Sequence, residues 1–376
     1  MVFAIDRDQL LDHLLIIQKG LPTKTPMPAL FGIKFELFED YLLMTSSNTD
    51  IAIQVLSDDP SLSITKTGRV VIPGRYLIEI IRRVTSKRIE FALIEERLLV
   101  IKADRSEFKL HLIDIEDYPE IDFLDLDDPV ILDSQLLKQV IRETNFATAT
   151  SEKRPILTGV NFKYADDHLY CVATDSYRLS QKDIKVRTHS KQFDIVIPNK
   201  SLEELQKIFD GYSEDVELYI NPNKVLFKME NILFQTRLLE GTYPDTRRII
   251  PKEFPFSITF NKEELISAVE RVSLLSPKDR ESNYSIIKLE LRADRVVEIS
   301  STNSEIGDAN EEVIPTSDPV GQPLRIAFSA RHLSEGLRSF SSSEITIDFA
   351  GEVRPFILKG NDDPDMIHLI LPVRID

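Results

Sequence analysis

The sequence predicts an α+β protein made of three similar units, each with two helices on one face of antiparallel sheet. A pattern of apolar strand, turn and amphipathic helix occurs three times, at residues 70–84 (VVIPGRYLIEIIRRV), 195–209 (IVIPNKSLEELQKIF) and 325–340 (RIAFSARHLSEGLRSF). The turns begin at Pro73, Pro198 and Ser329, which are 125 and 131 residues apart in the 376-residue chain. This spacing indicates one folding unit used three times, and we place the units at residues 1–126, 127–252 and 253–376.

The first unit opens with the strand VFAIDR and a helix from about Asp8 to Lys19. In the loop that follows, GLPTKTPMPAL, three prolines exclude regular structure. The segments FGIKFELF, YLLMTSS, IAIQVL and TGRVVIP predict strands before the second helix. After that helix, IEFALIE, RLLVIKA and SEFKLHLI alternate as antiparallel strands do, and an acidic linker spans residues 114–128.

The second and third units repeat this order of elements. A helix from Ser134 to about Phe146 follows the strand VILD, and its Leu136 matches Leu10 of the first unit and Leu265 of the third. Strands GVNFKY, HLYCVAT and FDIVIP precede the next helix, and VELYI, KVLFKM and ILFQTRLL follow it. The same strand end is marked in the three units by Asn48-Thr49-Asp50, Ala173-Thr174-Asp175 and Asn303-Ser304-Glu305.

Basic residues recur on the helices of all three units. Arg75, Lys200 and Arg331 are equivalent, and seven residues later come Arg82, Lys207 and Arg338. Seven residues are close to two helical turns, so each pair shares a face. The opposite faces are apolar, with Leu77, Ile80, Ile81 and Val84 in the first helix, Leu202, Leu205 and Phe209 in the second, and Leu333, Leu337 and Phe340 in the third. On the first helices, Lys138 and Arg142 lie one turn apart, and Arg271 matches Arg142. One basic face is usually a solvated surface, but its repetition favours a function.

Composition narrows the possible classes of protein. No apolar run approaches eighteen residues and the N-terminus does not resemble a signal peptide, so we expect no membrane span. The single cysteine, Cys171, excludes an intramolecular disulfide, fits a reducing cytoplasm and is expected to be a buried structural thiol. The net charge of −16 argues against general affinity for nucleic acid, although local basic patches decide where a polyanion can bind.

The motifs of catalysis and of metal binding are missing from the sequence. The six histidines are scattered, and there is no HExxH, CxxC, Walker-type loop or GxGxxG. Asp50 and Asp175 are the best enzyme candidates because they recur after a strand, but a turn or capping role is the simpler interpretation. The sequence therefore predicts no catalysis, no metal and no cofactor.

With three equivalent units, basic helices and no active site, the chain resembles the bacterial sliding clamp family, the beta subunit of DNA polymerase III. The resemblance covers the whole chain and is based on ATDSYRL at residues 173–179, YPDTRRIIP at 243–251 and LPVRID at 371–376. It implies a head-to-tail homodimeric ring of six DNA-clamp domains, with helices lining the hole and sheets outside. It also implies that the clamp hydrolyses nothing and acts in the cytoplasm as a processivity factor.

The repeated basic helix faces would then point inward at the phosphates of duplex DNA, without sequence specificity. The residues that we expect to face DNA are Lys24, Arg75, Arg82, Arg83, Lys138, Arg142, Lys153, Arg154, Lys200, Lys207, Arg271, Lys278, Arg331 and Arg338.

The resemblance implies protein partners that insert a short peptide into a pocket between the second and third domains. These partners are the replicative polymerase, the clamp loader and other proteins with a clamp-binding motif. Carried over to this sequence, the pocket is Leu157, Thr174, Tyr177, Arg178, Leu179, Pro244, Arg248, Ile249, Val353, Pro355, Leu371, Pro372, Val373 and Arg374. Arg178, Arg248 and Arg374 are expected near the rim. The alternative is that Leu157, Leu179 and Ile249 are ordinary core.

The ring contact implied by the resemblance joins Phe108 and Leu110 of one chain to Leu274 and Leu275 of the other. An edge strand must be paired or protected, and such pairing would extend the sheet around the ring. Two other classes remain open. A monomeric repeat adaptor that binds only proteins would sediment as a monomer instead of a dimer of about 86 kDa, twice the 43.1 kDa chain. An enzyme that uses the recurrent carboxylates would lose activity on Asp175→Asn.

Overall fold

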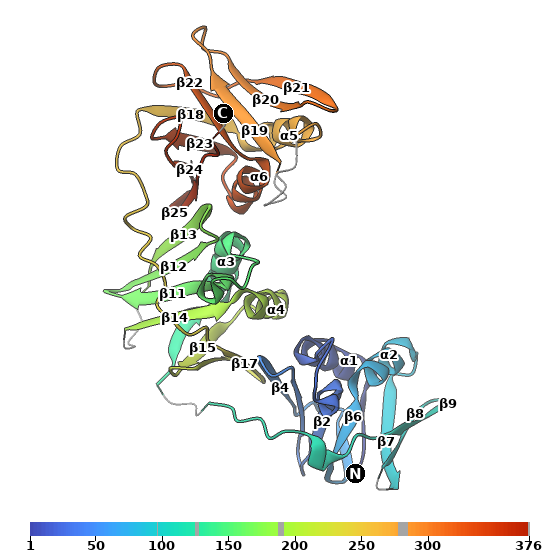
Figure 1. The fold of residues 1–376 in the computed structure, drawn as a ribbon. Coiled ribbons are helices and arrows are strands. Elements are labelled where there is room, and N and C mark those ends of the chain that lie inside the picture. The colour runs from blue at the N-terminus through green and yellow to red at the C-terminus, as the bar shows by residue number, and fades with distance from the viewer. Residues whose placement is uncertain (96, 125–127, 187–191, 277–284, 375–376) are drawn as a thin grey trace. The chain divides into compact units, whose positions relative to one another are not determined.

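The computed structural model describes residues 1–95, 97–124, 128–186, 192–276 and 285–374 (Figure 1). These residues form two compact units. The first unit comprises residues 1–137 and 200–238, and the second comprises the described residues among 138–199 and 239–376.

Six α-helices occur in the described residues: α1 (Arg7–Ile17), α2 (Gly74–Arg83), α3 (Ser134–Thr144), α4 (Asn199–Phe209), α5 (Lys262–Ser273) and α6 (Ala330–Ser339). Short 3-10 helices accompany them: η1 (Gln18–Gly20), η2 (Pro28–Phe31), η3 (Ile115–Asp117), η4 (Asn145–Ala147) and η5 (Pro155–Thr158). The sequence had predicted no regular structure in the proline-rich loop, and η2 shows that this prediction was wrong at the end of the loop. A proline at the first position of η2 and of η5 is compatible with a helical turn, because that position needs no N–H donor.

The first unit contains two antiparallel sheets. Its five-stranded sheet has the order β5 (Ser63–Lys66), β1 (Val2–Asp6), β7 (Arg88–Glu95), β8 (Leu98–Ala103), β9 (Ser106–His111). Its eight-stranded sheet has the order β10 (Val130–Asp133), β15 (Asp215–Ile220), β16 (Lys224–Met229), β17 (Ile232–Arg237), β4 (Ile51–Ser57), β3 (Leu42–Ser47), β2 (Gly32–Leu37), β6 (Gly68–Pro73).

The second unit also contains two antiparallel sheets. Its eight-stranded sheet has the order β14 (Phe193–Pro198), β11 (Gly159–Ala165), β12 (His168–Thr174), β13 (Arg178–Lys185), β25 (Asp363–Ile370), β24 (Phe356–Gly360), β23 (Glu344–Phe349), β18 (Phe256–Asn261). Its four-stranded sheet has the order β21 (Gly307–Val313), β20 (Val297–Asn303), β19 (Ile286–Leu291), β22 (Leu324–Ser329).

The first helix of each sequence repeat starts at the same kind of cap. The side chains of Asp6, Asp133 and Asn261 accept hydrogen bonds from backbone N–H groups of the following turn, as good N-caps do. The buried leucines four residues after the caps are Leu10, Leu137 and Leu265. The expected match of Leu136 to Leu10 was therefore wrong by one residue. Counted from the same caps, Arg142 corresponds to Glu270, so the expected match of Arg142 to Arg271 was also wrong.

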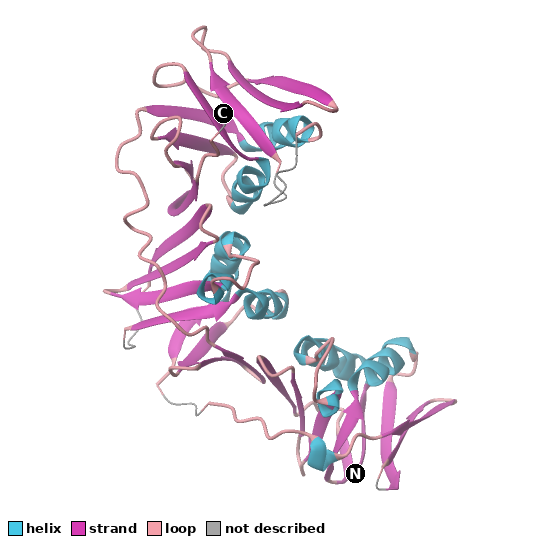
Figure 2. Ribbon diagram, viewed as in Figure 1, coloured by secondary structure: helices cyan, strands magenta, loops and turns pink. Residues whose placement is uncertain are grey.

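The second helices bury the leucines that the sequence singled out, Leu77, Leu202 and Leu333. In α2 the core face is completed by Ile78 and Ile81, whereas Ile80, which we had expected there, is only half-buried. In the first unit, α1 and α2 pack against each other on one side of the sheets, and in the second unit α5 and α6 do the same (Figure 2). This is the predicted arrangement of paired helices over antiparallel sheet.

Each eight-stranded sheet joins two sequence repeats edge to edge. In the first unit β4 pairs antiparallel with β17, and in the second unit β13 pairs antiparallel with β25. Each smaller sheet ends at an edge strand, β9 in the first unit and β21 in the second. Two edges of the kind that pair elsewhere in the chain are therefore available to another molecule.

Candidate functional site

The basic residues expected to face DNA are exposed wherever the structure describes their side chains, except for Lys138, which is half-buried. Lys278 lies outside the described residues. Arg75, Arg82 and Arg83 project from α2, Lys200 and Lys207 from α4, and Arg331 and Arg338 from α6.

Many of these cations have a carboxylate partner. Arg82 and Arg83 both contact Glu79 at 3.0 Å, Lys207 contacts Glu204 at 2.7 Å, and Arg331 contacts Glu335 at 2.8 Å. Arg271 contacts Glu311, and Arg338 contacts Glu270. Exposed pairs of this kind hold their partners weakly, so a phosphate can compete for the same guanidinium or ammonium group.

The expected peptide pocket is centred on the turn between β12 and β13. Thr174 ends β12, and its hydroxyl donates to the carbonyl of Arg178 at 2.5 Å, which closes the turn. The backbone N–H of Thr174 donates to the hydroxyl of Tyr243 at 3.0 Å, and the N–H of Leu371 donates to the carbonyl of Tyr177 at 2.9 Å. The turn is therefore tied to the segment around Tyr243 and to the C-terminal segment.

An apolar cluster lies beside this turn. It is made of the buried residues Val172, Leu179, Ile357 and Leu369, with Tyr243, Ile250, Phe254, Ile367 and Leu371 packed against it. Of these, the sequence had indicated Leu179 and Leu371 as pocket residues. The recurrence of a Tyr-Pro pair at Tyr118 and Tyr243 was a usable signal for Tyr243. The others could not be distinguished from ordinary strand residues.

The remaining pocket residues divide into buried and exposed groups. Leu157 and Leu179 are buried, as the ordinary-core interpretation predicted, but Ile249, which that interpretation also named, is 45% exposed. Tyr177, Ile249, Val353 and Val373 expose large apolar side chains. Among the hydrogen bonds and ion pairs of the described residues, none joins Arg248, Val353, Pro355 or Arg374 directly to the turn. Arg248 is exposed and pairs with Asp245 at 3.4 Å.

We had expected Arg178 at the rim of the pocket, but the structure places it inside the protein. Its side chain is only 4% exposed and contacts Asp175 at 3.0 Å. It also contacts Glu335 of α6 and donates to the carbonyl of Phe146 at 2.5 Å. The guanidinium therefore joins the second sequence repeat to the third inside the protein. These polar partners offset the free-energy cost of burying its charge.

Asp175 acts as the cap of this turn. Its carboxylate accepts from the backbone N–H groups of Tyr177 and Arg178. Asn48 makes the same contacts in the first repeat, and the Asn303 side chain accepts from the N–H of Glu305 in the third. The equivalent of Asp175 is therefore Asn48, not Asp50, and the carboxylate does not recur. The turn interpretation explains this residue.

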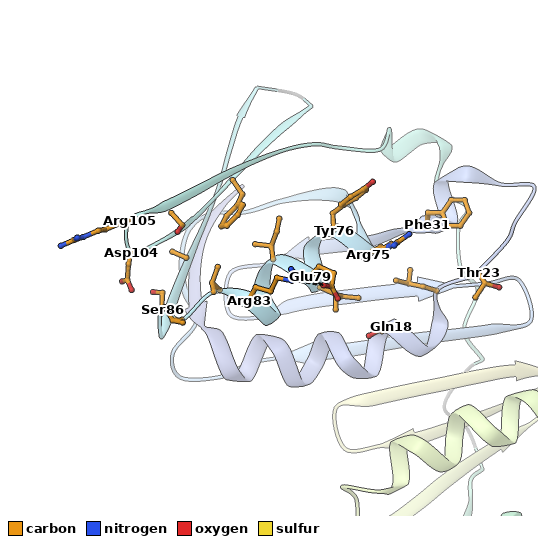
Figure 3. Close-up of a pocket in the computed structure, with 18 of the residues that line it drawn as sticks. Gln18, Thr23, Phe31, Arg75, Tyr76, Glu79, Arg83, Ser86, Asp104 and Arg105 are labelled. Carbon is orange, nitrogen blue, oxygen red and sulfur yellow. Dashed lines mark hydrogen bonds and ion pairs between the residues drawn. The ribbon is translucent and has the colours of Figure 1, made fainter.

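A large cleft borders the edge strand β9 in the first unit. It has a volume of about 1820 Å³ and lies between α2, the loop after η1 and the β8–β9 turn at Asp104 and Arg105 (Figure 3). Phe108, one of the expected ring-contact residues, belongs to its lining, and Tyr76 in the same cleft is 65% exposed. In the second unit Leu274, at the end of α5, is 80% exposed.

The described residues show neither a metal centre nor a membrane span. No group of three or more His, Cys, Asp or Glu side chains among them is placed to hold a metal ion. None of the described helices combines the length and hydropathy that a membrane span requires. Burial raises the pKa of the Cys171 thiol well above its usual value, so this cysteine is an unreactive core residue.

Comparison with known proteins identifies the family along the whole sequence. Residues 1–122, 131–245 and 247–374 match the N-terminal, central and C-terminal domains of the DNA polymerase III beta subunit. The chain belongs to the bacterial beta sliding clamp family.

Individual members of this family match the chain end to end. A beta sliding clamp of Staphylococcus epidermidis is 37% identical over 100% of this chain and 99% of its own length. Among solved structures, the beta chain from Streptococcus pneumoniae superposes with a TM-score of 0.95 at 37% identity, and the clamp from Bacillus subtilis with 0.93 at 35%. Each alignment covers 100% of both chains.

Two histidines near Arg178 should make this clamp-family chain sensitive to acid. Burial, with the Arg178 charge as the next cause, lowers the pKa of His332 to about 4 and that of His368 to about 3. The His368 ring packs so closely on α6 that a Cβ at Gly336 would lie 2.3 Å from it. In the unfolded chain both pKa values return to about 6.5. Below that pH the unfolded state binds more protons, so stability is complete above pH 6.5 and falls as pH decreases toward 4.

We expect each histidine to reduce the free energy of unfolding by about 1.4 kcal/mol per pH unit in this range. Urea unfolding at pH 7.5, 6.0 and 5.0 measures this slope. His368→Leu should make the slope shallower, whereas His111→Gln, at an exposed position, should leave it unchanged. Equal slopes in all three proteins would contradict the assignment.

Proposed function

We propose that the chain is a DNA sliding clamp: two copies close into a ring around duplex DNA and tether the replicative polymerase. The observation that supports this most strongly is the end-to-end match to all three domains of the DNA polymerase III beta subunit. The decisive experiment is retention on DNA. The loaded protein should remain on a closed circle in high salt and dissociate when that circle is linearised, whereas equal retention on both would contradict encirclement.

The ring closes by repeating a contact that the chain already makes twice. Strand β4 pairs with β17, and β13 pairs with β25. In the repeat order, β21 is the equivalent of β4 and β13, and β9 is the equivalent of β17. We therefore propose that β21 of each copy pairs antiparallel with β9 of the other.

The register of this pairing follows from the same equivalence. Strands β9 and β17 each follow a two-residue turn, so Phe108 of β9 occupies the position of Phe234 of β17. The pairing of β20 with β21 matches that of β3 with β4 and places Ala309 of β21 at the position of Ile53 of β4. Because Phe234 pairs with Ile53, Phe108 should lie opposite the partner's Ala309. One residue along, Lys109 should lie opposite the partner's Asp308. The register places half-buried residues together on one face and opposite charges on the other.

The helix ends support the expected contact with Leu274. Counted from the helix caps, Leu274 is the equivalent of Phe146, and Phe108 occupies the ladder position of His368. Within the chain, the rings of Phe146 and His368 pack with centroids 5.4 Å apart. The exposed Leu274 should therefore pack on Phe108 of the other copy and enter the cleft beside β9.

The DNA would be held by the exposed cations of the helices. Charge reversal at Arg82, Lys207 and Arg338 should weaken loading and retention severalfold and reduce the salt dependence, because phosphate contacts release counterions. The matched control reverses Lys66, Arg292 and Lys359, three exposed cations outside the helices. Equal retention of the helix variant and the control would mean that these helices do not line the channel.

The apolar surface around Tyr177 would capture a short peptide of the polymerase, the clamp loader or another partner. Tyr177 is 60% exposed on the turn that adjoins the buried apolar cluster, which suits an inserted side chain. The basic rim would then consist of Arg248 and Arg374 without Arg178. We propose that the chain catalyses nothing, and that a clamp of the bacterial replication machinery works in the cytoplasm. The domain limits at 1–126, 127–252 and 253–376 stay a prediction.

Deletion of residues 372–376 should weaken a polymerase-derived peptide at least tenfold, or about 1.4 kcal/mol. The fold should survive, because the deletion removes the bond from the Val373 N–H to the Ala327 carbonyl but leaves β25 intact. Tyr177→Ala should weaken the same peptide without changing DNA retention. Fluorescence anisotropy with a labelled peptide measures both, and unchanged affinity in both variants would refute the pocket assignment.

A further inference from the structure

In the first unit, a smaller cavity lies at the β3–β4 turn, the equivalent of the β12–β13 turn at the proposed peptide pocket. It has a volume of about 290 Å³ and is formed by η2, the turn between β3 and β4, residues 119–122 and the end of β17. Leu30, Ile51 and Ala52 form a buried apolar floor, and Met27 is exposed at the margin. All of these residues belong to the same compact unit.

This cavity is built in the same way as the proposed peptide pocket. The Ser47 hydroxyl donates to the Ile51 carbonyl at 2.9 Å, as the Thr174 hydroxyl donates to the carbonyl of Arg178. Leu30 is the third residue of η2 and is buried, as Leu157 is in η5. Pro119 follows the buried Tyr118, as Pro244 follows Tyr243. The repeat therefore produces the same combination of turn, short helix and Tyr-Pro pair twice.

Carboxylates outnumber cations by three to two in the lining of this cavity. In the ladder alignment Asp50 takes the place of Tyr177, and Glu120 and Asp122 continue the wall of the cavity. Asp122 contacts Lys224 at 3.6 Å, but its carboxylate remains exposed. Asp50 and Glu120 form none of the ion pairs found among the described residues, and Arg237 is the other cation of the lining. Carboxylates thus stand at the rim here, whereas Arg248 and Arg374 were assigned to the rim of the peptide pocket.

We propose that this cavity is a second peptide site, which takes an apolar side chain flanked by lysine or arginine from a partner protein. Its volume is at the lower end of ligand pockets, about 300–1,000 Å³, so it accommodates one or two side chains. The basic flank of the peptide pairs with Asp50 and Glu120, because rim charges select among partners by complementarity. A partner with acidic flanks is selected against at this junction. The two junctions of one chain would therefore hold peptides of opposite charge.

Two fluorescein-labelled hexapeptides test this proposal, each with a central leucine pair, flanked by lysines in one and by glutamates in the other. The full-length chain should bind the lysine peptide with Kd below about 1 mM, at the weak end of specific binding. Asp50→Lys with Glu120→Lys should weaken it at least tenfold. The matched control, Glu116→Lys with Asp117→Lys, makes the same charge change at exposed residues outside the cavity and should change affinity less than twofold.

The peptide pocket supplies the second arm of the experiment. Tyr177→Ala should leave binding of the lysine peptide unchanged. Three results would overturn the proposal: no binding of the lysine peptide at 1 mM, equal weakening in the cavity variant and its control, or weakening by Tyr177→Ala alone. Retention on circular DNA does not depend on this cavity, so it separates failure of this proposal from failure of the clamp function.

Discussion

Replacing Leu274 and Leu275 together with alanine is expected to turn a dimer of about 86 kDa into the 43.1 kDa monomer at micromolar concentration. Large-to-small substitution at buried apolar contacts costs about 2–5 kcal/mol per residue, and the ring contains two copies of the contact. The monomer should stay folded, because Leu274 is 80% exposed within one chain and contributes little to its core. Sedimentation measures the mass, and circular dichroism checks the fold.

The proposed register gives this prediction a sharper control. Lys109→Asp or Asp308→Lys alone should weaken the dimer by placing like charges opposite each other, whereas the two changes together should restore it. A stable dimer after the double alanine change would mean that the copies meet elsewhere. Failure of the charge exchange to restore a weakened dimer would mean that the strands pair in another register.

Replacing Arg178 with methionine should cost about 3–5 kcal/mol of folding free energy, because it leaves buried carboxylates without their partner. The Asp175 and Glu335 side chains are only 9% and 27% exposed. Burial alone would raise the pKa of Glu335, yet the hydrogen bonds from Arg331 and Arg178 keep it below the usual value. In the variant we therefore expect the pKa of Glu335 to rise.

Arg331 provides the matched control, since it contacts the same Glu335 but is 55% exposed. Arg331→Met should cost no more than about 1 kcal/mol, because exposed ion pairs contribute little. Urea unfolding at pH 7.5 compares the two variants. Similar losses in both would contradict the role given to Arg178, whereas Arg178→Met combined with Glu335→Gln should recover part of the stability.

Patterns in the sequence predicted the fold class and the positions of the helices. The leucines near the start of the second helices are buried as expected, because apolar periodicity is a local property of the sequence. The residue-by-residue alignment of the three repeats was predicted less accurately. The equivalents of Leu10 and Asp175 each shifted by one or two residues, because short repeats align equally well in neighbouring registers until hydrogen bonds fix the turn.

By itself, the sequence determined the three-fold repeat, the exposed cations of the helices and the lack of catalytic motifs. Only the tertiary structure showed that Arg178 is buried, where it joins the second sequence repeat to the third, and is not a rim residue. Its partners Phe146 and Glu335 are 32 and 157 residues away in sequence, and no local pattern encodes such contacts. The family resemblance had already placed the strand of Phe108 and Leu110 at a sheet edge. Only the tertiary structure showed that β21 is an edge strand too, because an edge is defined by which strands pair across the whole sheet.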